Sequence, residues 1–573
     1  MNTVPGSFFT TRPAARRPSL ALLALALLPL AACIRLGRTL SHASVRSDAR
    51  TLDAEAIRQL VPRGDPSRPE LAVCVEWRGD RATATLRNLG SEPVPVHDVV
   101  LFDWKHELPG DTAFYGEGFQ MLSQTAGTLA NPVDLEQYTD RDHYRLSEPA
   151  GFRSVYGLAL VSRTEHDRLL IGFASSRRFV GRIDVSPTHI RAVIDGDGVA
   201  LAPGETWRLE DLFVGAGAER DELLARLSYW IERNHPRRPW PSPPRGWCSW
   251  YCFGPGVTAQ NVVDNLEVLQ HELPGFEYVQ IDDGYQPVMG DWLETGRAFG
   301  GDVRGVIAEI EKRGLKPALW VAPFIASGES KLFKQHPDWF VQGEDGKPLR
   351  SDTVGFGGWR QGPWYCLDGT NPNAQKHLLA LFHTLRADWG VEYFKLDANY
   401  WGAIRGKHFD PQATRIEAYR RGMQAVREGA GDAFLLGCNH PLWGSLGLID
   451  GSRSSMDIDR SWESVARTGR QNLLRAWQNG RLWWNDPDCV LLSGLEPEVL
   501  AFHLDVVRAC GGMILSGDDL SRLDSAQRAL LGRLARTGSS AARFDDALEN
   551  GALELPQGTT RVRLDWSKPP RLH

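Results

Sequence analysis

The sequence predicts a multidomain protein: a (β/α)8 TIM barrel, preceded by a β-sandwich and followed by a short β-rich segment. A proline-rich connector at residues 236–244 cannot stay helical and separates two regions of different pattern. Before it, short β-prone runs are separated by Gly, Pro and Asn, which is typical of a sandwich. After it, eight short apolar runs alternate with amphipathic stretches, which favours a barrel. A doubly wound sheet is the alternative.

The first 33 residues are predicted to be a targeting segment. Arg12, Arg16 and Arg17 precede an apolar run at residues 21–30 that is too short for a comfortable transmembrane span. The run ends Leu30-Ala31-Ala32-Cys33, which resembles a bacterial lipobox. The resemblance implies cleavage before Cys33, lipidation of its thiol and a lipid anchor in the bacterial cell envelope, facing the periplasm or at the outer membrane. An ordinary signal peptide is the alternative.

Residues 34–66 are predicted to form a polar spacer with a short helix, and residues 67–235 the β-sandwich. The β-prone runs of the sandwich lie at 73–77, 83–86, 99–104, 154–162, 169–174, 189–194 and 207–214. A helix is expected at 221–233, where apolar residues recur at helical spacing.

The barrel is predicted over residues 236–538, because β-rich runs and helical stretches alternate there. The expected strands are 246–251, 278–281, 317–322, 393–396, 434–438, 451–456, 482–484 and 513–515. The expected helices are 259–271, 302–313, 374–388, 415–427, 462–479 and 496–508. Residues 539–573 are expected to form a small β-appendage that is complete only by pairing with the barrel.

Composition excludes several classes of function. The chain has 573 residues and a net charge of −6 without a basic patch, so nucleic acid is not expected as a partner. No histidine–carboxylate cluster has metal spacing and no glycine-rich phosphate loop follows a strand, so neither a metal nor an organic cofactor is expected. Cys248 and Cys252 are interpreted as packing residues, because no second pair has zinc spacing.

Carboxylates gather where the predicted barrel strands end. They follow the second, fourth, sixth, seventh and eighth strands, at Asp282, Asp283, Asp397, Asp457, Asp486, Asp518 and Asp519. Barrel enzymes carry their catalytic groups at the C-terminal ends of the strands. Two carboxylates from different strands are what retaining glycoside hydrolysis needs, one as nucleophile and one as proton donor. A salt bridge at a strand end is the alternative interpretation.

The fourth strand end has a pattern suited to a nucleophile. Residues two apart share a face of an extended strand, so Lys395, Asp397 and Asn399 are expected to point into one cavity. A lysine beside Asp397 would keep that carboxylate ionised. The proton donor must instead hold a proton, which burial near the nucleophile would favour and a neighbouring Arg453 would oppose.

Six segments in this order resemble glycoside hydrolase family 36 and its relative family 27, the α-galactosidase clan. They are Gly-Trp-Cys-Ser-Trp-Tyr at 246–251, Gln-Ile-Asp-Asp-Gly-Tyr at 280–285, Gly-Asp-Trp at 290–292, Leu-Trp-Val-Ala-Pro at 319–323, Phe-Lys-Leu-Asp-Ala-Asn at 394–399 and Arg-Ser-Ser-Met-Asp at 453–457. The resemblance covers about half of the chain, and it implies a TIM-barrel glycosidase.

The resemblance also implies a role for each matching residue. Asp397 matches the nucleophile and Asp457 the acid/base. The other matches are Arg453, Lys395 and Asn399 contacting sugar hydroxyls, Asp282 and Asp283 binding O4 and O6 of galactose, and Trp320 and Trp250 as aromatic walls. The segment 437–442, which includes Cys438, replaces the family 36 motif after the fifth strand and would shape the pocket around O2. Asp459 has the same strand parity as Asp457 and is its rival as the acid.

These matches predict a retaining, exo-acting α-galactosidase that removes terminal α-galactosyl units from oligosaccharides or glycans. A raffinose-synthase-like galactosyl transferase and an α-N-acetylgalactosaminidase are alternatives on the same barrel. A non-catalytic glycan-binding lipoprotein is a third class, although both catalytic carboxylates are present. The chain departs from family 36 at 437–442, which is closer in part to family 27. Its N-terminal and C-terminal domains are short, so the sequence predicts neither a monomer nor an oligomer.

Overall fold

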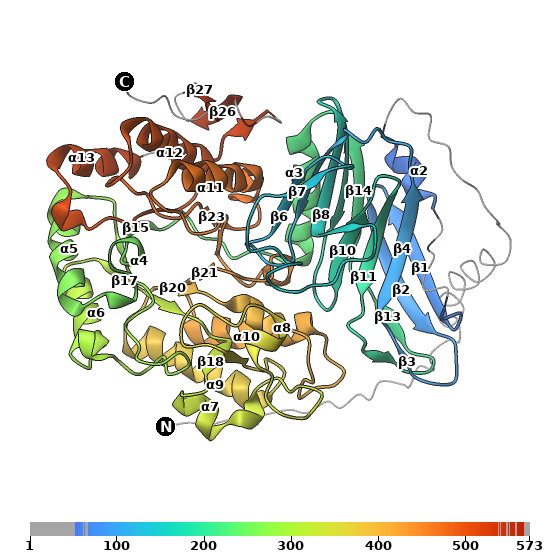
Figure 1. The fold of residues 1–573 in the computed structure, drawn as a ribbon, viewed down its shortest axis with the longest axis horizontal. Coiled ribbons are helices and arrows are strands. Elements are labelled where there is room, and N and C mark those ends of the chain that lie inside the picture. Colours follow the sequence, from blue (N-terminus) through green and yellow to red (C-terminus); the bar gives the residue numbers. More distant parts are fainter. Residues whose placement is uncertain are drawn as a thin grey trace, which may run out of the picture. The chain divides into compact units, whose positions relative to one another are not determined.

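The computed structural model describes residues 52–566 except 61, 63–66, 537, 539, 546–547, 549 and 556–557. The predicted targeting segment, the lipidation site at Cys33 and most of the spacer lie outside the described residues. The spacer's described part holds the short helix α2 (Ala54–Arg58), which begins with a side-chain cap from Asp53. Figure 1 shows the β-rich region first along the chain, in blue to teal, and the helix-rich region after it. Among the described residues, no helix is both long and apolar enough to cross a membrane.

The first region is all-β, as predicted. Its strands are β1 (Leu71–Arg78), β2 (Arg81–Asn88), β3 (Val94–Pro95), β4 (Asp98–Lys105), β5 (Ala113–Glu117), β6 (Gln124–Gly127), β7 (Pro132–Asp134), β8 (Arg153–Thr164), β9 (Asp167–Phe173), β10 (Val180–Val185), β11 (His189–Asp195), β12 (Ala200–Leu201), β13 (Thr206–Arg208) and β14 (Leu212–Gly217). The main antiparallel sheet has the order β1-β2-β14-β9-β8-β10-β11-β4. We call this region the β-domain. The helix α3 (Arg220–Asn234) ends it.

The hydrogen-bonding path of this sheet is continuous, so no break divides it into the two sheets of a sandwich. Its end strands β1 and β4 nevertheless contact each other, which shows that the sheet curls. Register shifts accompany the curl, for instance between Ala192 and Val193 in β11. Along β2 the inward residues Ala82, Ala84 and Leu86 are buried and alternate with half-buried neighbours, because side chains alternate across a strand.

The second region is a nearly closed barrel of eight parallel strands, and each begins within two residues of its predicted first residue, although the predicted first and sixth strands run three residues too far. The strands are β15 (Arg245–Cys248), β16 (Tyr278–Ile281), β17 (Lys316–Val321), β20 (Tyr393–Leu396), β21 (Phe434–Gly437), β22 (Gly451–Arg453), β23 (Trp484–Asp486) and β24 (Ile514–Ser516). They pair in sequence order and β24 returns to β15. A doubly wound sheet would not return in this way, so that alternative is wrong. The Met513 amide donates to the Asn485 carbonyl at 2.8 Å and brings the two ends together.

Helices follow most barrel strands, as the apolar spacing predicted. They are α5 (Ala259–Glu272), α6 (Val303–Lys312), α9 (Pro372–His383), α10 (Arg415–Ala430), α11 (Trp462–Arg475), α12 (Pro497–Cys510) and α13 (Ser525–Leu534). Capping boxes at Thr258 and Thr414 begin α5 and α10. The predicted helix 462–479 ends earlier, at Arg475, and a 3-10 turn continues it. A hairpin of β18 (Ile325–Ser327) and β19 (Trp364–Cys366) lies outside the barrel sheet.

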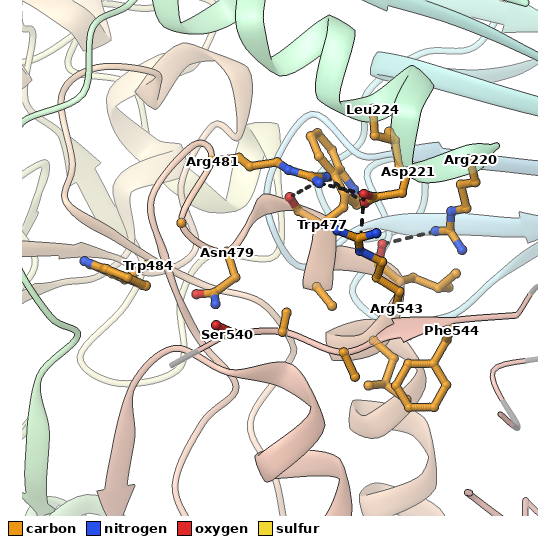
Figure 2. A pocket seen from close by; sticks show the side chains of 16 residues that line it. Arg220, Asp221, Leu224, Trp477, Asn479, Arg481, Trp484, Ser540, Arg543 and Phe544 are labelled. Carbon is orange, nitrogen blue, oxygen red and sulfur yellow. Dashed lines mark hydrogen bonds and ion pairs between the residues drawn. The ribbon is translucent and has the colours of Figure 1, made fainter. Parts of the chain in front are cut away.

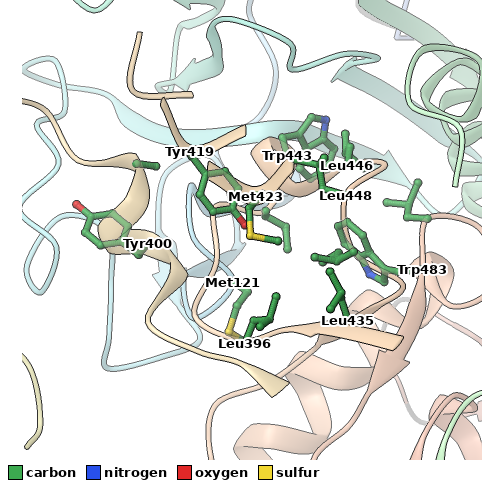
Figure 3. Packing of buried hydrophobic residues seen from close by; sticks show 14 of the residues in the cluster. Met121, Leu396, Tyr400, Tyr419, Met423, Leu435, Trp443, Leu446, Leu448 and Trp483 are labelled. Carbon is green, nitrogen blue, oxygen red and sulfur yellow. The ribbon is translucent and has the colours of Figure 1, made fainter. Parts of the chain in front are cut away.

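The β-domain and the barrel share one hydrophobic core. Met121, from the loop between β5 and β6, is fully buried and belongs to the same cluster as Leu396 and Leu435 at the ends and middle of barrel strands (Figure 3). Trp443 of the barrel donates its indole N–H to the Phe173 carbonyl of β9 at 2.7 Å. The β-domain is therefore packed against the strand ends that carry the predicted site.

The C-terminal appendage forms the expected small β structure. Its strands β25 (Arg543–Phe544), β26 (Asn550–Leu555) and β27 (Gly558–Arg563) form an antiparallel sheet. Leu548, Leu553 and Leu564 of this segment cluster with Val506 and Ala509 of α12. The three strands pair with one another and not with the barrel strands, in contrast to the expectation, and the sheet gains its apolar core by packing against a barrel helix.

Candidate active site

Asp397 follows directly on the last residue of β20, at the C-terminal end of the barrel. Its carboxylate accepts the Trp320 indole N–H at 3.1 Å and the Ala398 amide at 2.6 Å. Burial raises the pKa of Asp397, while Lys395 and these two donors act in the opposite direction. Two fixed donors and a nearby cation suit a carboxylate that must be ionised and held in place to attack.

Lys395 points into the same site but forms its ion pair with a different aspartate. Its ammonium lies 3.0 Å from Asp282 Oδ2, and both side chains are buried. Burial acts to lower the pKa of Lys395, but the attraction of Asp282 and nearby groups raises it well above its usual value. The predicted neighbourhood of Lys395 and Asp397 is present, while the direct partner of the lysine is Asp282.

Asn399 does not share the face of Lys395 and Asp397, so the alternation prediction is wrong for this residue. The chain leaves the extended conformation at Ala398, which has a left-handed φ of 52°, and Asn399 begins a 3-10 helix. Its amide donates to the carbonyls of Leu396 at 2.8 Å and Cys438 at 3.3 Å. Asn399 therefore holds two strand ends together. The Cys438 thiol is buried, which raises its pKa, and the charge of Asp397 adds to that effect.

Asp282 and Asp283 follow β16 and are both buried. Asp282 Oδ2 accepts from Gln280 Nε2 at 2.6 Å as well as from Lys395. Asp283 accepts from Gln286 at 2.7 Å and forms an ion pair with Arg360, whose Nε lies 3.1 Å from Oδ2. Each aspartate thus has its own cation, which offsets the mutual repulsion of the two carboxylates.

Arg360 is a site residue that sequence reasoning missed. It lies between β18 and β19, on a loop rich in glycine, and it is 77 residues away from Asp283 along the chain. No local pattern links the two. The one signal in the sequence is an arginine in a glycine- and tryptophan-rich segment, residues 355–364, that follows a strand of the barrel.

Asp457 follows β22 and pairs with Arg453 at 2.5 Å. The expectation that Asp457 is buried is wrong, because its side chain is 58% exposed. Arg453 itself is buried, and its Nη2 also lies 3.0 Å from Tyr251 Oη and 2.6 Å from Asp488 Oδ2. The Asp457 carboxylate is exposed to solvent, where a leaving group and a water molecule can reach it. Its partner Arg453 is held in place by Tyr251 and Asp488.

Asp459, the rival proton donor, lies outside this network. The strand ends at Arg453, so the shared parity of Asp457 and Asp459 has no structural meaning. The Asp459 amide donates to Ser464 Oγ of α11 at 2.9 Å. Arg453 contacts Asp457, and the charge of Asp457 acts on the pKa of Asp397, which links Asp457 to the nucleophile.

Asp488 is a second residue that sequence reasoning missed. It accepts hydrogen bonds from Tyr251 Oη and, at 2.8 Å, from the amide of Ile458, the neighbour of Asp457. Its backbone is left-handed with a φ of 77°, an uncommon conformation for aspartate that functional sites often contain. Burial raises the pKa of Asp488, and Arg453 acts in the opposite direction. Its signal in the sequence was a second aspartate two residues beyond the end of β23.

Trp320 and Trp250, the two predicted aromatic walls, differ in burial and in what they contact. Trp320 is buried, and its indole N–H donates to Asp397. Trp250 is half-buried in the short helix α4 (Trp250–Phe253), packed beside the cluster that contains Ile458. Its neighbour Tyr251 makes the polar contact with Arg453.

The β-domain also reaches the site. Tyr144 is buried and donates its hydroxyl to Asn439 Oδ1 at 3.0 Å, next to Cys438. Tyr400, just beyond the nucleophile's strand, donates to the Tyr144 carbonyl at 3.2 Å. Two loops at the barrel mouth are therefore supported by the first domain.

A metal site and a second cavity are two other kinds of site that the described residues could form. Within the described part of the chain, no group of three or more His, Cys, Asp and Glu residues is placed to hold a metal ion. A cavity of about 310 Å³ lies between α3, the 3-10 turn after α11 and the C-terminal segment (Figure 2). The only carboxylate in its lining is Asp221, which Arg481 holds with two contacts of 2.9 and 2.8 Å.

Comparison with known proteins identifies the barrel. The Melibiase family model matches residues 270–426. The α-galactosidase AgaA of Geobacillus stearothermophilus is 33% identical over 154 residues, which cover 26% of this chain and 20% of the relative. A protein of Flavonifractor plautii named A type blood α-D-galactosamine galactosaminidase is 28% identical over 34% of this chain and 18% of the relative. The matched parts span 17–22% of the length of these and similar curated relatives.

Solved structures show the same fold over most of the chain. The α-galactosidase TtGalA of Thermus thermophilus, in complex with stachyose, has a TM-score of 0.59 and 25% identity, covering 80% of this chain and 98% of that chain. The family 36 α-galactosidase AgaA of Geobacillus stearothermophilus has a TM-score of 0.60 and 14% identity, covering 84% and 71%. The Melibiase match over residues 270–426, the relatives and the shared fold together support a barrel similar to that of the melibiase-like α-galactosidases of glycoside hydrolase family 36.

Proposed function

We propose that this protein is a retaining exo-α-galactosidase that hydrolyses terminal α-galactosyl units of oligosaccharides or glycans. The observation that carries the proposal is the pair of carboxylates at the ends of β20 and β22. Asp397 is half-buried and held by fixed donors, whereas Asp457 is open to solvent and paired with a buried arginine. Different environments for two carboxylates are what a nucleophile and an acid/base require.

The reaction proceeds by double displacement. An oxygen of Asp397 attacks the anomeric carbon, and the bond from that carbon to the leaving oxygen breaks while Asp457 donates its proton to this oxygen. A galactosyl ester on Asp397 results. Asp457, now ionised, takes a proton from water, whose oxygen attacks the anomeric carbon and releases Asp397. Both steps invert the anomeric centre, so the α-configuration is retained.

The remaining polar residues hold the sugar. Asp282, Asp283 and Arg453 are buried beside the reacting groups and are placed to bond sugar hydroxyls. Asp283 exchanges part of its contact with Arg360 for a hydroxyl when substrate binds. Support for galactose comes from the relatives, which are named α-galactosidases, and from complexes of the Thermus thermophilus structure with stachyose and p-nitrophenyl α-D-galactopyranoside.

The test is hydrolysis of p-nitrophenyl glycosides by protein lacking residues 1–33, beside the Asp397→Ala variant. The panel contains the α-galactoside, the α-N-acetylgalactosaminide, the α-glucoside and the β-galactoside. We expect turnover of the α-galactoside alone, its loss in Asp397→Ala, and rescue by azide with a β-galactosyl azide product. Turnover of another sugar would retain the mechanism and change the substrate. No turnover of any of them would contradict the proposal.

We further propose that the chain is a lipoprotein of the bacterial envelope, anchored through Cys33. The support is the sequence Leu30-Ala31-Ala32-Cys33 after a short apolar run. Labelling with radioactive palmitate should modify the wild-type protein and leave Cys33→Ser unlabelled. Equal labelling of both proteins, or none of either, would contradict lipidation at this residue.

A further inference from the structure

An exposed tryptophan, Trp359, lies at the rim of the candidate active site. Its side chain is 42% exposed, whereas Trp320 and Trp364 beside it are buried. The ring centroid of Trp359 is 6.5 Å from that of Trp320, whose indole N–H donates to Asp397. Trp359 therefore stands one aromatic ring outward from the nucleophile.

The loop that carries Trp359 is tightly held. Gly358 has a φ of +111°, and a Cβ there would lie 2.5 Å from the ring of Trp364, so the backbone passes directly against that indole. Ser351 Oγ donates to the Gly357 carbonyl at 2.7 Å. The Trp359 ring meets Trp364 edge-on at 4.7 Å between centroids. The exposed indole is thus held in a defined place by buried neighbours.

The next two residues join this loop to the loop after β16. Arg360 pairs with Asp283, a residue of the candidate sugar site. The side-chain Nε2 of Gln361 donates to the Pro287 carbonyl at 2.9 Å. Its side-chain Oε1 accepts from the backbone N–H of Met289 at 2.8 Å. Single exposed apolar residues are common and need no explanation. Trp359 differs because its immediate neighbour contacts the sugar site.

We propose that Trp359 is the stacking platform for the sugar next to the cleaved galactose, so that it selects oligosaccharides over galactosides with a small leaving group. This inference rests on the proposed function. The inner residues surround the terminal galactose, so the leaving-group sugar must lie outward, towards solvent. A pyranose ring has a face of C–H groups with polar edges, and a half-exposed indole offers a flat apolar surface for that face.

The experiment compares raffinose with α-galactosyl fluoride, whose leaving group is too small to reach the platform. Trp359→Ala should lower kcat/KM for raffinose about tenfold, chiefly through KM, as for the loss of one aromatic contact. It should leave kcat/KM for the fluoride and inhibition by free galactose unchanged. Trp359→Phe should retain most of the raffinose activity. Tyr229→Ala is the matched control, an aromatic residue 55% exposed on α3, and should change neither substrate.

Two outcomes would overturn the inference. Equal losses on both substrates would place Trp359 in the galactose site, and an unchanged value for raffinose would remove it from recognition. If the wild-type protein hydrolyses neither substrate, the proposed function fails instead. Calorimetric titration with raffinose then decides separately, because Trp359→Ala must weaken binding while Tyr229→Ala must not.

Discussion

Glu117 of the β-domain and Arg475 of the barrel form a buried ion pair across the boundary of the two regions. Glu117 Oε2 accepts from Arg475 Nη2 at 2.7 Å and Nε at 2.9 Å, and the two side chains are 0% and 1% exposed. Arg475 also donates to the carbonyl of Ser454, the residue after β22, at 3.2 Å. One guanidinium therefore joins the first domain to the segment that carries Asp457.

Removing one partner of this pair should destabilise the whole structure. Glu117→Ala leaves the Arg475 charge buried without its counterion, so we expect a loss of about 3–5 kcal/mol in the free energy of unfolding. The urea midpoint of unfolding measures it. Glu329→Gln is the control, because it breaks the exposed pair with Lys334 and should leave the urea midpoint nearly unchanged. Similar midpoints for the two variants would contradict the role of the buried pair.

Substrates whose leaving groups differ in their need for a proton can distinguish Asp457 from Asp459 as the proton donor. Asp457→Ala should lower kcat for raffinose roughly a hundredfold to ten-thousandfold, because its leaving oxygen needs a proton. For α-galactosyl fluoride, whose leaving group needs little protonation, kcat should fall far less. Asp459→Ala should change neither. The opposite pattern would make Asp459 the acid.

Asp488 is expected to act through its neighbours, without touching substrate. Asp488→Asn keeps an oxygen that can accept the Ile458 amide but removes the charge that holds Arg453 from below. Arg453 then loses one of its two carboxylate partners, so its position beside Asp457 is less fixed. We expect kcat for raffinose to fall while KM changes little. Asp459→Asn, at an exposed neighbouring position, is the control. An unchanged kcat with a simple loss of stability would show that Asp488 is only structural.

The acid limb of the pH profile should respond to Trp320. The nucleophile must be ionised, and the acid limb of kcat/KM reports its pKa in the free enzyme. Burial raises the pKa of Asp397, and the Trp320 N–H lowers it. Trp320→Phe removes this donor, so the pKa of Asp397 rises further and the acid limb should move to higher pH. A limb that stays in place or moves to lower pH would contradict Asp397 as the titrating group.

Local patterns in the sequence located much of the barrel and part of the site. The hydrophobic spacing predicts the first residue of each barrel strand to within two residues, including the strands that lead to Asp282, Asp397 and Arg453. That spacing depends on neighbours along the chain, so one sequence suffices to find it. The same reasoning failed for Asn399, where a single left-handed residue at Ala398 ends the alternation.

By itself, the sequence determined that two carboxylates stand at the ends of two parallel strands and that a cation accompanies each. Only the tertiary structure decided which groups pair. Lys395 bonds Asp282, Arg360 bonds Asp283, and Arg453 lies between Asp457 and Asp488. These partners come from different strands and loops, and their distances depend on how these segments pack. Burial depends on the same packing, which is why Asp397 is half-buried while Asp457 is open to solvent.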